Sequence, residues 1–391
     1  MERIGIFGGS FDPPHIGHLQ AAQQAQQSLR LDRLLLIPAA KAPHKSGSYA
    51  DAAHRLRMLQ LATANLPAIA VSDLELRRQG PSYSYETVAE VAQMYPEAEI
   101  FLLMGSDMFL SFLTWACPEK ILEKATLAVL YRGDRDETAR VEAYKAELQA
   151  AGHRVQLIQN RVLEISSTQL RRLLAFGCAE EFLPAGVEDY IRKNGLYDIS
   201  ADWKNLPMEQ LEQVVTALLN PNRVAHVLGC RDTAVALAKR WGVDETDAAR
   251  AGLLHDITKA LDGPLQLTLC GSYGKVLDDF SRRYPKTLHA FTGSLVAERI
   301  FGENEAVVSA IECHTTGKAA MNMLEKIIYV ADYMEPNRDF PGVDKLRQLA
   351  FSDMDEALRC GLNMTLEHLA RQGAEVSPAS RAALEYLNVK V

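Results

Sequence analysis

The first half of the chain alternates short apolar runs with amphipathic stretches, and this alternation restricts its fold more than any other feature. The apolar runs are candidate β-strands at Arg3–Phe7, Arg33–Pro38, Ala68–Leu74, Glu99–Met104, Thr126–Tyr131 and Arg154–Gln159. The stretches between them have the apolar spacing of helices, as at Ile16–Leu29, Tyr85–Tyr95 and Glu137–Ala151. Such alternation predicts an α/β domain with a mostly parallel, doubly wound sheet. Ligands of such sheets bind beyond the carboxyl ends of the strands.

The second half has a different pattern, because helical periodicity continues there without a credible series of strands. The predicted helices are Met208–Leu219, Arg223–Trp241, Asp244–Leu261, His289–Phe301, Glu305–His314, Leu324–Tyr333 and Met354–Arg371. A chain of 391 residues is also long enough for two domains. The turn-rich sequence NGLYDISADWKNLP separates the two patterns. We therefore predict an α/β domain at 1–199 and an all-α domain at 206–391.

Composition excludes several classes of function. The formal net charge of −8 argues against a partner that is a nucleic acid polymer, because such binding needs massed Lys and Arg. The sequence has neither a signal peptide nor an apolar run long enough to span a membrane, so we expect a cytoplasmic protein without a membrane partner. The six cysteines are scattered and form no C-x-x-C pair, which predicts reduced thiols.

The first predicted strand runs into the sequence GGSFDPPHIGHL, which combines glycines, prolines and two histidines. Gly8 and Gly9 let the backbone approach a ligand closely, because they carry no Cβ atom. A helix that starts just after the prolines directs its free amides to the same place, where anions bind favourably. His15 and His18 are three residues apart and are expected on one side of this helix. The pattern predicts a phosphate site with two imidazoles, although a Gly/Pro turn with two surface histidines has the same composition.

This string resembles the G-x-F-D-P-x-H-x-G-H signature of nucleotidyltransferases that build dinucleotides. The segments IPAAKAPHK, LLMGSDMFLSFLTW and ISSTQLRRLL resemble, in order, motifs of the bacterial nicotinate-mononucleotide adenylyltransferases. The resemblance covers nearly all of Met1–Tyr197 and implies a Rossmann-like nucleotidyltransferase domain. It implies transfer of the adenylyl group from ATP, bound with Mg²⁺, to nicotinate mononucleotide, which gives deamido-NAD and pyrophosphate.

The same resemblance implies roles for individual residues. His15 and His18 would bind the triphosphate and stabilise charge at the α-phosphorus, while Lys41 and Arg171 would hold the leaving pyrophosphate. No protein nucleophile is needed, because the mononucleotide's own phosphate attacks in line. The implied substrate-binding residues are Gly8, Gly9, Ser10, Phe11, Tyr83, Ser84, Thr87, Gly105, Asp107, Trp115, Arg132, Ser166, Ser167 and Thr168. Among them, Asp107 would bind the adenosine ribose and Trp115 would stack on the pyridine ring.

Residue chemistry agrees with part of this assignment and leaves alternatives open. The Ser-Ser-Thr run at 166–168 can cap a helix whose first amides face phosphate, although an ordinary capped helix has the same pattern. Asp107 also fits a helix N-cap, and Trp115 also fits a core aromatic residue. After the strand Thr126–Tyr131, many members of the family have R-P-G, whereas this chain has Arg132-Gly133-Asp134.

Four histidines and two aspartates lie within the apolar helical sequence of the second half. They are His226, His255, Asp256, His289, His314 and Asp332. A single buried histidine is commonly a core residue with a hydrogen-bond partner, but burying six polar groups is costly without a common purpose. His255 and Asp256 are adjacent and, on a helix, would point about 100° apart, so that they can serve neighbouring metal ions. A carboxylate that bridges two ions, completed by imidazoles, predicts activation of water for attack on phosphorus.

These residues lie in the segments NPNRVAHVLG, GLLHDITK, LHAFTG, CHTTG and YVADYMEPNRDFPGV. The segments resemble motifs of the HD-domain phosphohydrolases, and more narrowly of the YqeK-like branch, which splits diadenosine tetraphosphate (Ap4A) symmetrically into two ADP. The resemblance covers most of Met208–Val391. It implies one ion held by His226, His255, Asp256 and Asp332, and a second held by Asp256, His289 and His314. Mixed imidazole and carboxylate ligands favour iron, with manganese as the alternative, over calcium.

Two basic residues of the same segments are implied to act on the substrate. Lys259 and Arg338 would face its phosphates, with Asp256 and Lys259 as the catalytic residues; Lys259 also fits an ordinary solvated helix lysine. The sequence thus predicts a bifunctional enzyme that takes ATP, nicotinate mononucleotide and Ap4A, and it leaves homo-oligomerisation open. Two alternatives remain for the helical half: a nucleotide-sensing regulatory module, or a hydrolase of a different nucleotide.

Overall fold

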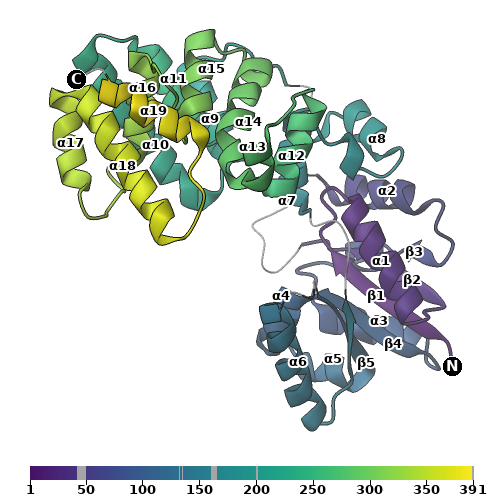
Figure 1. The fold of residues 1–391 in the computed structure, drawn as a ribbon. Coiled ribbons are helices and arrows are strands. Elements are labelled where there is room, and N and C mark those ends of the chain that lie inside the picture. Colours follow the sequence, from purple (N-terminus) through teal and green to yellow (C-terminus); the bar gives the residue numbers. More distant parts are fainter. Residues whose placement is uncertain (42–49, 132, 134, 160–164, 200, 390–391) are drawn as a thin grey trace. The chain divides into compact units, whose positions relative to one another are not determined.

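The structure is a computed structural model of the 391-residue chain, and it describes residues 1–41, 50–131, 133, 135–159, 165–199 and 201–389. The chain divides into two compact units, Met1–Ser200 and Ala201–Val391. In Figure 1 the first unit combines strands with helices, and the second unit is drawn with helices.

Six parallel strands form the sheet of the first unit, in the order β3-β2-β1-β4-β5-β6. They are β1 (Arg3–Gly9), β2 (Arg33–Pro38), β3 (Ile69–Val71), β4 (Glu99–Gly105), β5 (Ala125–Tyr131) and β6 (Val155–Gln159). All six predicted strands are present, and the predicted doubly wound α/β class is confirmed. β3 ends earlier than expected, because a 3-10 turn at Leu74–Arg77 (η1) follows it and the Ser72 hydroxyl accepts the Leu74 amide.

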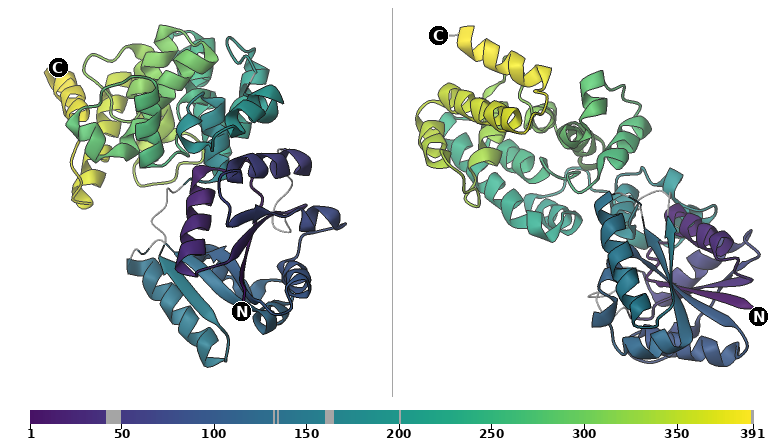
Figure 2. Two further views of the ribbon diagram at one scale, coloured as in Figure 1. Left: turned by 90° about the vertical axis from the view of Figure 1, so that its right-hand side faces the viewer. Right: turned by 60° about the horizontal axis from the view of Figure 1, so that its bottom comes forward.

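Helices cover both faces of this sheet, as the views in Figure 2 show. The helices of this unit are α1 (Ile16–Ser28), α2 (Ala52–Thr63), α3 (Ser84–Met94), α4 (Ser106–Leu110), α5 (Pro118–Lys124), α6 (Arg135–Ala150), α7 (Ser167–Ala175) and α8 (Val187–Lys193). Successive strand residues point to opposite faces. Leu102 of β4 packs in a core with α3, α5 and α6, whereas its neighbour Phe101 packs in another core with α1 and α2.

The direction of winding of the sheet reverses between β1 and β4. β1 pairs with β2 on one side and with β4 on the other, so the connections that leave β1 and β4 diverge. In doubly wound sheets, ligands bind at this point where the strand order reverses. The GGSFDPPH segment follows β1 and the GSD segment follows β4, so both predicted nucleotide motifs lie here.

The described part of the second unit is all helical, as predicted. Its helices are α9 (Met208–Leu218), α10 (Pro221–Trp241), α11 (Glu245–Leu254), α12 (Gly263–Ser272), α13 (Asp279–Arg283), α14 (Leu288–Val296), α15 (Glu305–Cys313), α16 (Met323–Met334), α17 (Val343–Ser352), α18 (Met354–Arg371) and α19 (Pro378–Val389). α10 packs against α11 and α16, and α15 packs against α14 and α16 (Figure 1). A π-helical turn, Ala297–Phe301, extends α14.

The predicted helix Asp244–Leu261 is wrong at its carboxyl end, because α11 ends at Leu254. The amides of Ile257, Lys259 and Leu261 each donate to the carbonyl three residues earlier, so tight turns replace the helix. Side chains stabilise these turns. The Thr258 hydroxyl donates to the His289 carbonyl at 2.9 Å, and Gln266 Nε2 donates to the Thr258 carbonyl at 2.7 Å. His255 and Asp256 therefore lie in a turn rather than on one helix.

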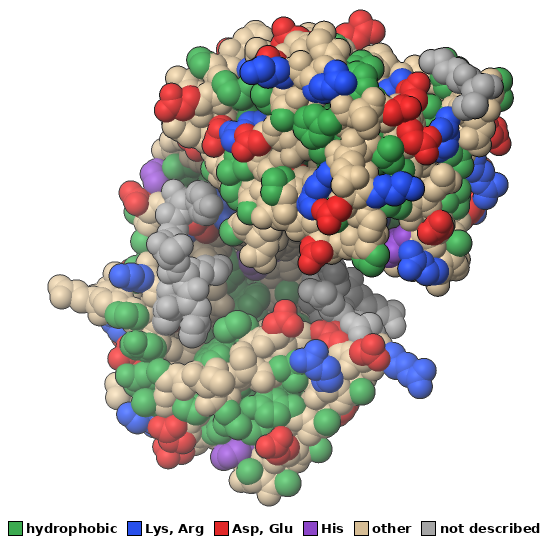
Figure 3. All heavy atoms as spheres, turned by 90° about the vertical axis from the view of Figure 1, so that its left-hand side faces the viewer, with side chains coloured by type: hydrophobic (Ala, Val, Ile, Leu, Met, Phe, Trp, Pro, Cys, Tyr) green, Lys and Arg blue, Asp and Glu red, His purple; other side chains and the backbone are tan. Residues whose placement is uncertain are grey.

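The cysteines, the apolarity of the helices and the surface charges bear on the expectations from composition. All six cysteines are free, as predicted. Among the described residues, no helix has the length and apolar character needed to cross a bilayer. On the face drawn in Figure 3, basic side chains are interspersed with acidic ones.

Candidate functional site

The turn after β1 brings the two predicted histidines of the first unit into ring contact. His15 is the N-cap of α1, and its Nδ1 accepts the His18 backbone amide at 3.3 Å. His18 Nδ1 accepts the His15 amide at 3.2 Å in return. The two rings stack with centroids 3.5 Å apart, and the ring of Phe11 contacts His18 at 5.0 Å. This reciprocal capping fixes both imidazoles at the end of α1 that attracts anions.

Burial lowers the pKa of His15 to about 3 from an ordinary value of 6.5. Between these values the unfolded chain binds a proton that the folded chain does not, so stability falls as the pH falls.

When the pH is lowered to about 5, we expect the free energy of unfolding of the first unit to decrease. The decrease should be about 2 kcal/mol larger in the wild type than in His15→Asn. Asparagine keeps an N-cap acceptor but does not titrate. Urea unfolding at several pH values measures this difference, and His153→Asn, at a half-buried surface position, is the control. Equal pH dependence in wild type and His15→Asn would contradict the assignment.

The start of α7 contacts the same turn. Ser166 is the N-cap of α7, which confirms the predicted helix start. The Ser167 hydroxyl donates to the Pro13 carbonyl at 3.1 Å, and Arg171 Nη1 donates to the Asp12 carbonyl at 2.6 Å. The amino-terminal ends of α1 and α7 thus lie beside one turn, where both helix dipoles favour negative charge.

Asp12 connects this turn to the end of the first unit. Its carboxylate is buried, and Oδ1 accepts the Tyr197 hydroxyl at 2.7 Å and the Ala50 amide at 3.2 Å. Burial and the charge of Asp12 raise the pKa of Tyr197, so the hydroxyl keeps its proton and donates. Tyr197 belongs to the short 3-10 turn η4 (Leu196–Asp198). Residues 185 positions apart in sequence therefore support the histidine turn together.

We expect Tyr197→Phe to lower the free energy of unfolding of the first unit by about 2 kcal/mol, because it removes a hydrogen bond to a buried carboxylate. Urea unfolding of the full chain, followed with a probe of the first unit, measures the loss. Tyr95→Phe is the matched control, since the Tyr95 hydroxyl accepts Arg33 at an exposed site and its removal should cost about 0.5 kcal/mol or less. If both variants unfold alike, the Asp12 contact does not stabilise the turn.

Other predicted substrate residues lie on segments near the carboxyl end of β1. Lys41 is exposed, and its carbonyl accepts the Ser82 amide at 2.9 Å, next to Tyr83 and Ser84 at the start of α3. The same segment is joined to the end of β1, because the Ala39 amide donates to the Gly9 carbonyl at 2.9 Å. Apart from its chain neighbours, no described atom lies within 4 Å of a Cβ atom added at Gly8. Ser10 and Thr168 lie on the two motifs already described.

Asp107 and Trp115, which follow β4, differ in their exposure to solvent. Gly105 is the N-cap of α4 and Asp107 is exposed in its first turn, so Asp107 is not the cap that its sequence position also allowed. Trp115 is half-buried and packs against Phe112 with ring centroids 5.4 Å apart.

Thr87, which was predicted to lie near the substrate, belongs to α3. It is buried, and its hydroxyl donates to Glu75 Oε1 at 2.6 Å and accepts Arg78. The hydroxyl is thus engaged within the protein. The predicted Arg132 lies outside the described residues.

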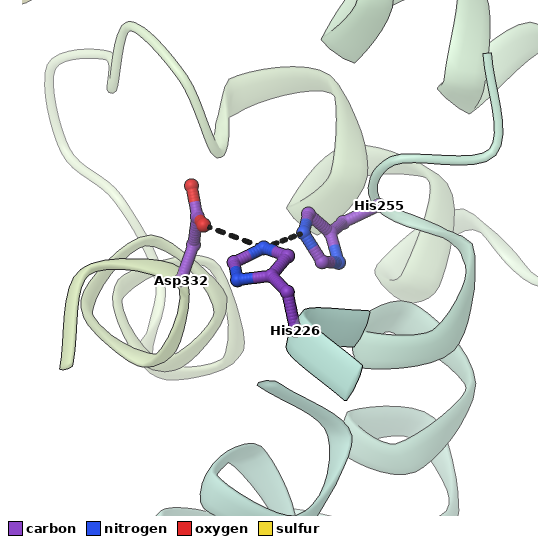
Figure 4. Close-up of side chains that lie close together, drawn as sticks. All are labelled: His226, His255 and Asp332. Carbon is purple, nitrogen blue, oxygen red and sulfur yellow. Dashed lines mark hydrogen bonds and ion pairs between the residues drawn. The ribbon is translucent and has the colours of Figure 1, made fainter. Parts of the chain in front are cut away.

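The predicted ligands of the helical unit converge from five helices or helix ends. Figure 4 shows His226 of α10 between His255, at the end of α11, and Asp332 of α16. His226 Nε2 lies 3.3 Å from His255 Nε2 and 3.1 Å from Asp332 Oδ1. The two imidazoles are buried, and the Asp332 side chain is 15% exposed. These three residues form one group with the geometry of a metal site.

Asp256 lies between this group and a second group, formed by His289 and His314. Its Oδ2 is 3.5 Å from His255 Nε2, and its Oδ1 is 3.4 Å from His289 Nε2 and 3.7 Å from His314 Nε2. Asp256 Oδ1 is buried, and no described residue forms a hydrogen bond with it. The structure thus brings all six predicted ligands together, with Asp256 facing both groups.

The orientation of the rings determines which nitrogen faces the centre. Each ring places Nδ1 against an oxygen. For three histidines the oxygen is a backbone carbonyl: Gly252 for His255 at 2.7 Å, Lys286 for His289 at 2.9 Å, and Ile311 for His314 at 2.7 Å. For His226 it is Glu335 Oε1, at 3.0 Å. In neutral rings Nδ1 then carries the proton, and Nε2 directs its lone pair to the centre. Burial lowers the pKa of His255 to about 4 and that of His289 to about 3, so protonation does not satisfy these lone pairs.

Lone pairs that face one another in a buried centre need a cation. Burial alone would raise the pKa of Asp256, but the surrounding imidazoles and the Lys259 ammonium lower it overall, so this carboxylate is anionic. Imidazole nitrogens and carboxylate oxygens together suit divalent transition metals. The residues therefore fit a divalent metal centre.

Three cationic side chains reach this centre from its solvent side. Arg223 Nε donates to Asp256 Oδ2 at 2.6 Å, Lys259 Nζ donates to His289 Nε2 at 2.8 Å, and Arg338 Nη2 donates to Asp332 Oδ1 at 2.6 Å. Their side chains are 29%, 41% and 33% exposed, respectively. The predicted Lys259 and Arg338 thus contact metal-type ligands while keeping an exposed part.

Sequence reasoning missed several residues of these sites. Arg223 and Glu335 contact predicted ligands, and the Thr315 hydroxyl lies 3.0 Å from His289 Nε2. Arg223 and Glu335 are each three positions from a predicted ligand in the same chain segment, which is the helical spacing that could have indicated them. In the first unit, Asp12 lies within the nucleotidyltransferase signature and Tyr197 at the end of the resemblance, and the sequence predicts a role for neither.

Comparison with protein families agrees with this geometry. A family model described as cytidylyltransferase-like matches residues 6–173, and one described as an HD domain matches residues 223–337. Fold and site together therefore define a nucleotidyltransferase-type α/β domain followed by a helical HD domain with a divalent-metal site.

Known relatives include proteins that match one half and a protein that matches both. The chain is 43% identical over 197 residues to a probable nicotinate-nucleotide adenylyltransferase of Thermus thermophilus, covering 50% of this chain and 99% of the relative. It is 32% identical over 340 residues to a probable nicotinate-nucleotide adenylyltransferase/Ap4A hydrolase of Mycoplasma pneumoniae, covering 85% of this chain and 88% of the relative. A crystal structure of a predicted HD superfamily hydrolase involved in NAD metabolism, from Clostridium acetobutylicum, is 36% identical, with a TM-score of 0.47, and covers 48% of this chain and 99% of that one. The chain belongs to the family of two-domain proteins that join a nicotinate-nucleotide adenylyltransferase to an Ap4A hydrolase.

Proposed function

We propose that the chain is a bifunctional enzyme. Its first domain, at 1–199, transfers the adenylyl group of ATP to nicotinate mononucleotide, which gives deamido-NAD and pyrophosphate. Its second domain, at 206–391, hydrolyses Ap4A symmetrically to two ADP. The relative from Mycoplasma pneumoniae, which aligns with 85% of the chain and carries both activities in its name, is the observation that supports this pairing most directly.

Adenylyl transfer is supported by the convergence of groups that stabilise phosphate. The stacked His15 and His18, the amino-terminal ends of α1 and α7, and Arg171 all lie at the turn after β1. Negative charge that develops at the α-phosphorus and on the leaving pyrophosphate would be stabilised there, with Lys41 assisting from the neighbouring segment. The exposed Asp107 would bind the adenosine ribose, and Trp115 would stack on the pyridine ring. Mg²⁺ is expected to accompany the ATP.

Hydrolysis of the tetraphosphate is supported by the ligand geometry of the helical domain. His226, His255, Asp256 and Asp332 would hold one divalent ion, and Asp256, His289 and His314 would hold another. We propose iron, with manganese as the alternative, because the donors are imidazole nitrogens and carboxylate oxygens. When bound, such ions supply an activated water and neutralise charge on phosphate oxygens.

Three partly exposed cations support binding of the polyphosphate chain at this site. Arg223, Lys259 and Arg338 each bond an acceptor of the cluster, and these acceptors are the proposed metal ligands. Their donors would therefore turn to substrate phosphates when the ligands are engaged, and the guanidinium groups suit bidentate contacts with phosphate. The contact of Arg223 with Asp256 supports the same role for Arg223 as for the predicted Lys259 and Arg338.

Product analysis with the full chain tests the proposal. With ATP, Mg²⁺ and nicotinate mononucleotide we expect deamido-NAD and pyrophosphate, and with Ap4A and Mn²⁺ or Fe²⁺ we expect ADP as the single nucleotide product. Release of AMP and ATP would contradict symmetrical cleavage. Binding of Ap4A without any product would favour a sensing module, and faster turnover of another nucleotide would change the proposed substrate.

A further inference from the structure

Glu335 is a buried carboxylate that directly follows α16 and contacts one proposed metal ligand. It is 1% exposed, and its Oε1 lies 3.0 Å from His226 Nδ1. Its Oε2 accepts the Asn337 backbone amide at 2.7 Å and the Asn337 side-chain amide at 2.9 Å. The position of the carboxylate is therefore fixed by two donors in addition to the imidazole.

The position of His226 in α10 explains why this ligand has a different partner from the other three. His255, His289 and His314 lie at the ends of helices or in the first turn, and each bonds the carbonyl three residues before it. Carbonyl groups near helix ends have bonding capacity that the helix itself does not use. His226 lies within α10 (Pro221–Trp241), where the carbonyls accept helix amides, so its Nδ1–H needs a side-chain acceptor.

A glycine of α10 provides room for the Glu335 carboxylate. A Cβ atom added at Gly229 of α10 would lie 2.5 Å from Glu335 Oε2 and 3.2 Å from Asn337 Nδ2. Glycine has no side chain that stabilises a helix, and in a helix interior it costs about 1 kcal/mol relative to alanine. Its presence here is explained by the space that the Glu335 carboxylate occupies.

We infer that Glu335 is a positioning residue for the metal ion held by His226: it fixes the ring and the proton on Nδ1, and its negative charge makes Nε2 a stronger donor to the metal. Partners of this kind change metal affinity by about 10-fold to 100-fold. The carbonyl partners of the other three histidines carry no net charge. The effect of Glu335 is therefore specific to the His226 ion, and the ion held by His289 and His314 does not depend on it. This inference rests on the metal centre of the proposed function.

Titration of the full chain with Mn²⁺, by calorimetry and by electron paramagnetic resonance, tests the inference. We expect wild-type protein to bind two ions. Glu335→Ala should weaken one of them by about 10-fold to 100-fold and leave the other unchanged, and Glu335→Gln should lie between, because it keeps an acceptor but loses the charge. Gly229→Ala should weaken the same ion, because its Cβ atom displaces the carboxylate without removing any polar group.

Two control variants distinguish positioning from general damage to the fold. Glu325→Gln removes a carboxylate on α16 that is 2% exposed and bonds Lys318 rather than a ligand. Gly271→Ala adds a Cβ atom in α12 where no atom lies within 4 Å. Both should bind two ions with wild-type affinity. Unchanged affinities in Glu335→Ala, or equal weakening of both ions, would overturn the inference. Wild-type protein that binds neither Mn²⁺ nor Fe²⁺ would instead overturn the proposed metal centre.

Discussion

Replacing Asp256 by alanine should lower Ap4A hydrolysis by more than about 100-fold and release bound metal from both positions. The reason is that Asp256 is the carboxylate that faces both groups of ligands, 3.5 Å from His255 Nε2 and 3.4 Å from His289 Nε2. Loss of a residue that only supports a ligand already costs about 10-fold to 100-fold, so loss of the shared ligand should cost more. Metal analysis and ADP release from Ap4A, measured on the full chain, give the two quantities.

Adenylyl transfer by the same Asp256→Ala protein is the internal control, because His15 and His18 belong to the other unit. It should stay near the wild-type rate. Asp232→Ala is the matched control on α10, since the Asp232 side chain is 66% exposed and bonds Arg231. ADP release from Asp256→Ala at the wild-type rate would rule out a centre in which this carboxylate joins two ions.

Replacing His18 by alanine should lower kcat for adenylyl transfer by about 10²-fold to 10³-fold. This is the usual effect of removing one group that stabilises charge in a transition state. The His18 ring stacks on His15 at the amino-terminal end of α1, where the triphosphate is proposed to bind. Initial-rate measurements with ATP and nicotinate mononucleotide should show the loss mainly in kcat rather than in KM.

His18→Ala also removes one acceptor of the α1 capping box, so stability must be measured beside activity. We expect a cost of about 1 kcal/mol, too small to unfold the domain. Ap4A hydrolysis by this variant should equal that of the wild type. A folded His18→Ala protein with nearly normal kcat would remove His18 from the mechanism.

The parts of the fold that sequence predicted best are those fixed by local burial. Each strand of the sheet is a short apolar run, and Arg33–Pro38 was predicted with its observed bounds because five of its six residues are buried. The end of α11 was missed for the opposite reason. Apolar residues continue at helical spacing to Ile257 and Leu261, and both are buried. What ends the helix is a set of hydrogen bonds from Thr258 and Gln266 to distant groups, which periodicity does not contain.

The candidate site could be predicted where polar residues interrupt apolar sequence. Histidines inside apolar helices are conspicuous, and all four were identified with their two aspartates. Glu335 was missed because it directly follows a helix, where acidic residues are common on the surface. Tyr197 was missed because its partner Asp12 is 185 residues away in sequence, and no local pattern connects them. Residues that act through a second residue thus leave little trace in sequence.

The bonds from Nδ1 of His255, His289 and His314 to carbonyls three residues earlier affect the entropy of metal uptake. A free imidazole must stop rotating when it binds an ion, and this ordering lowers affinity. Here the three rings are held by their own backbone segments. Folding has therefore already ordered them, and binding does not have to. A preorganised set of this kind favours tight binding at low concentrations of free metal.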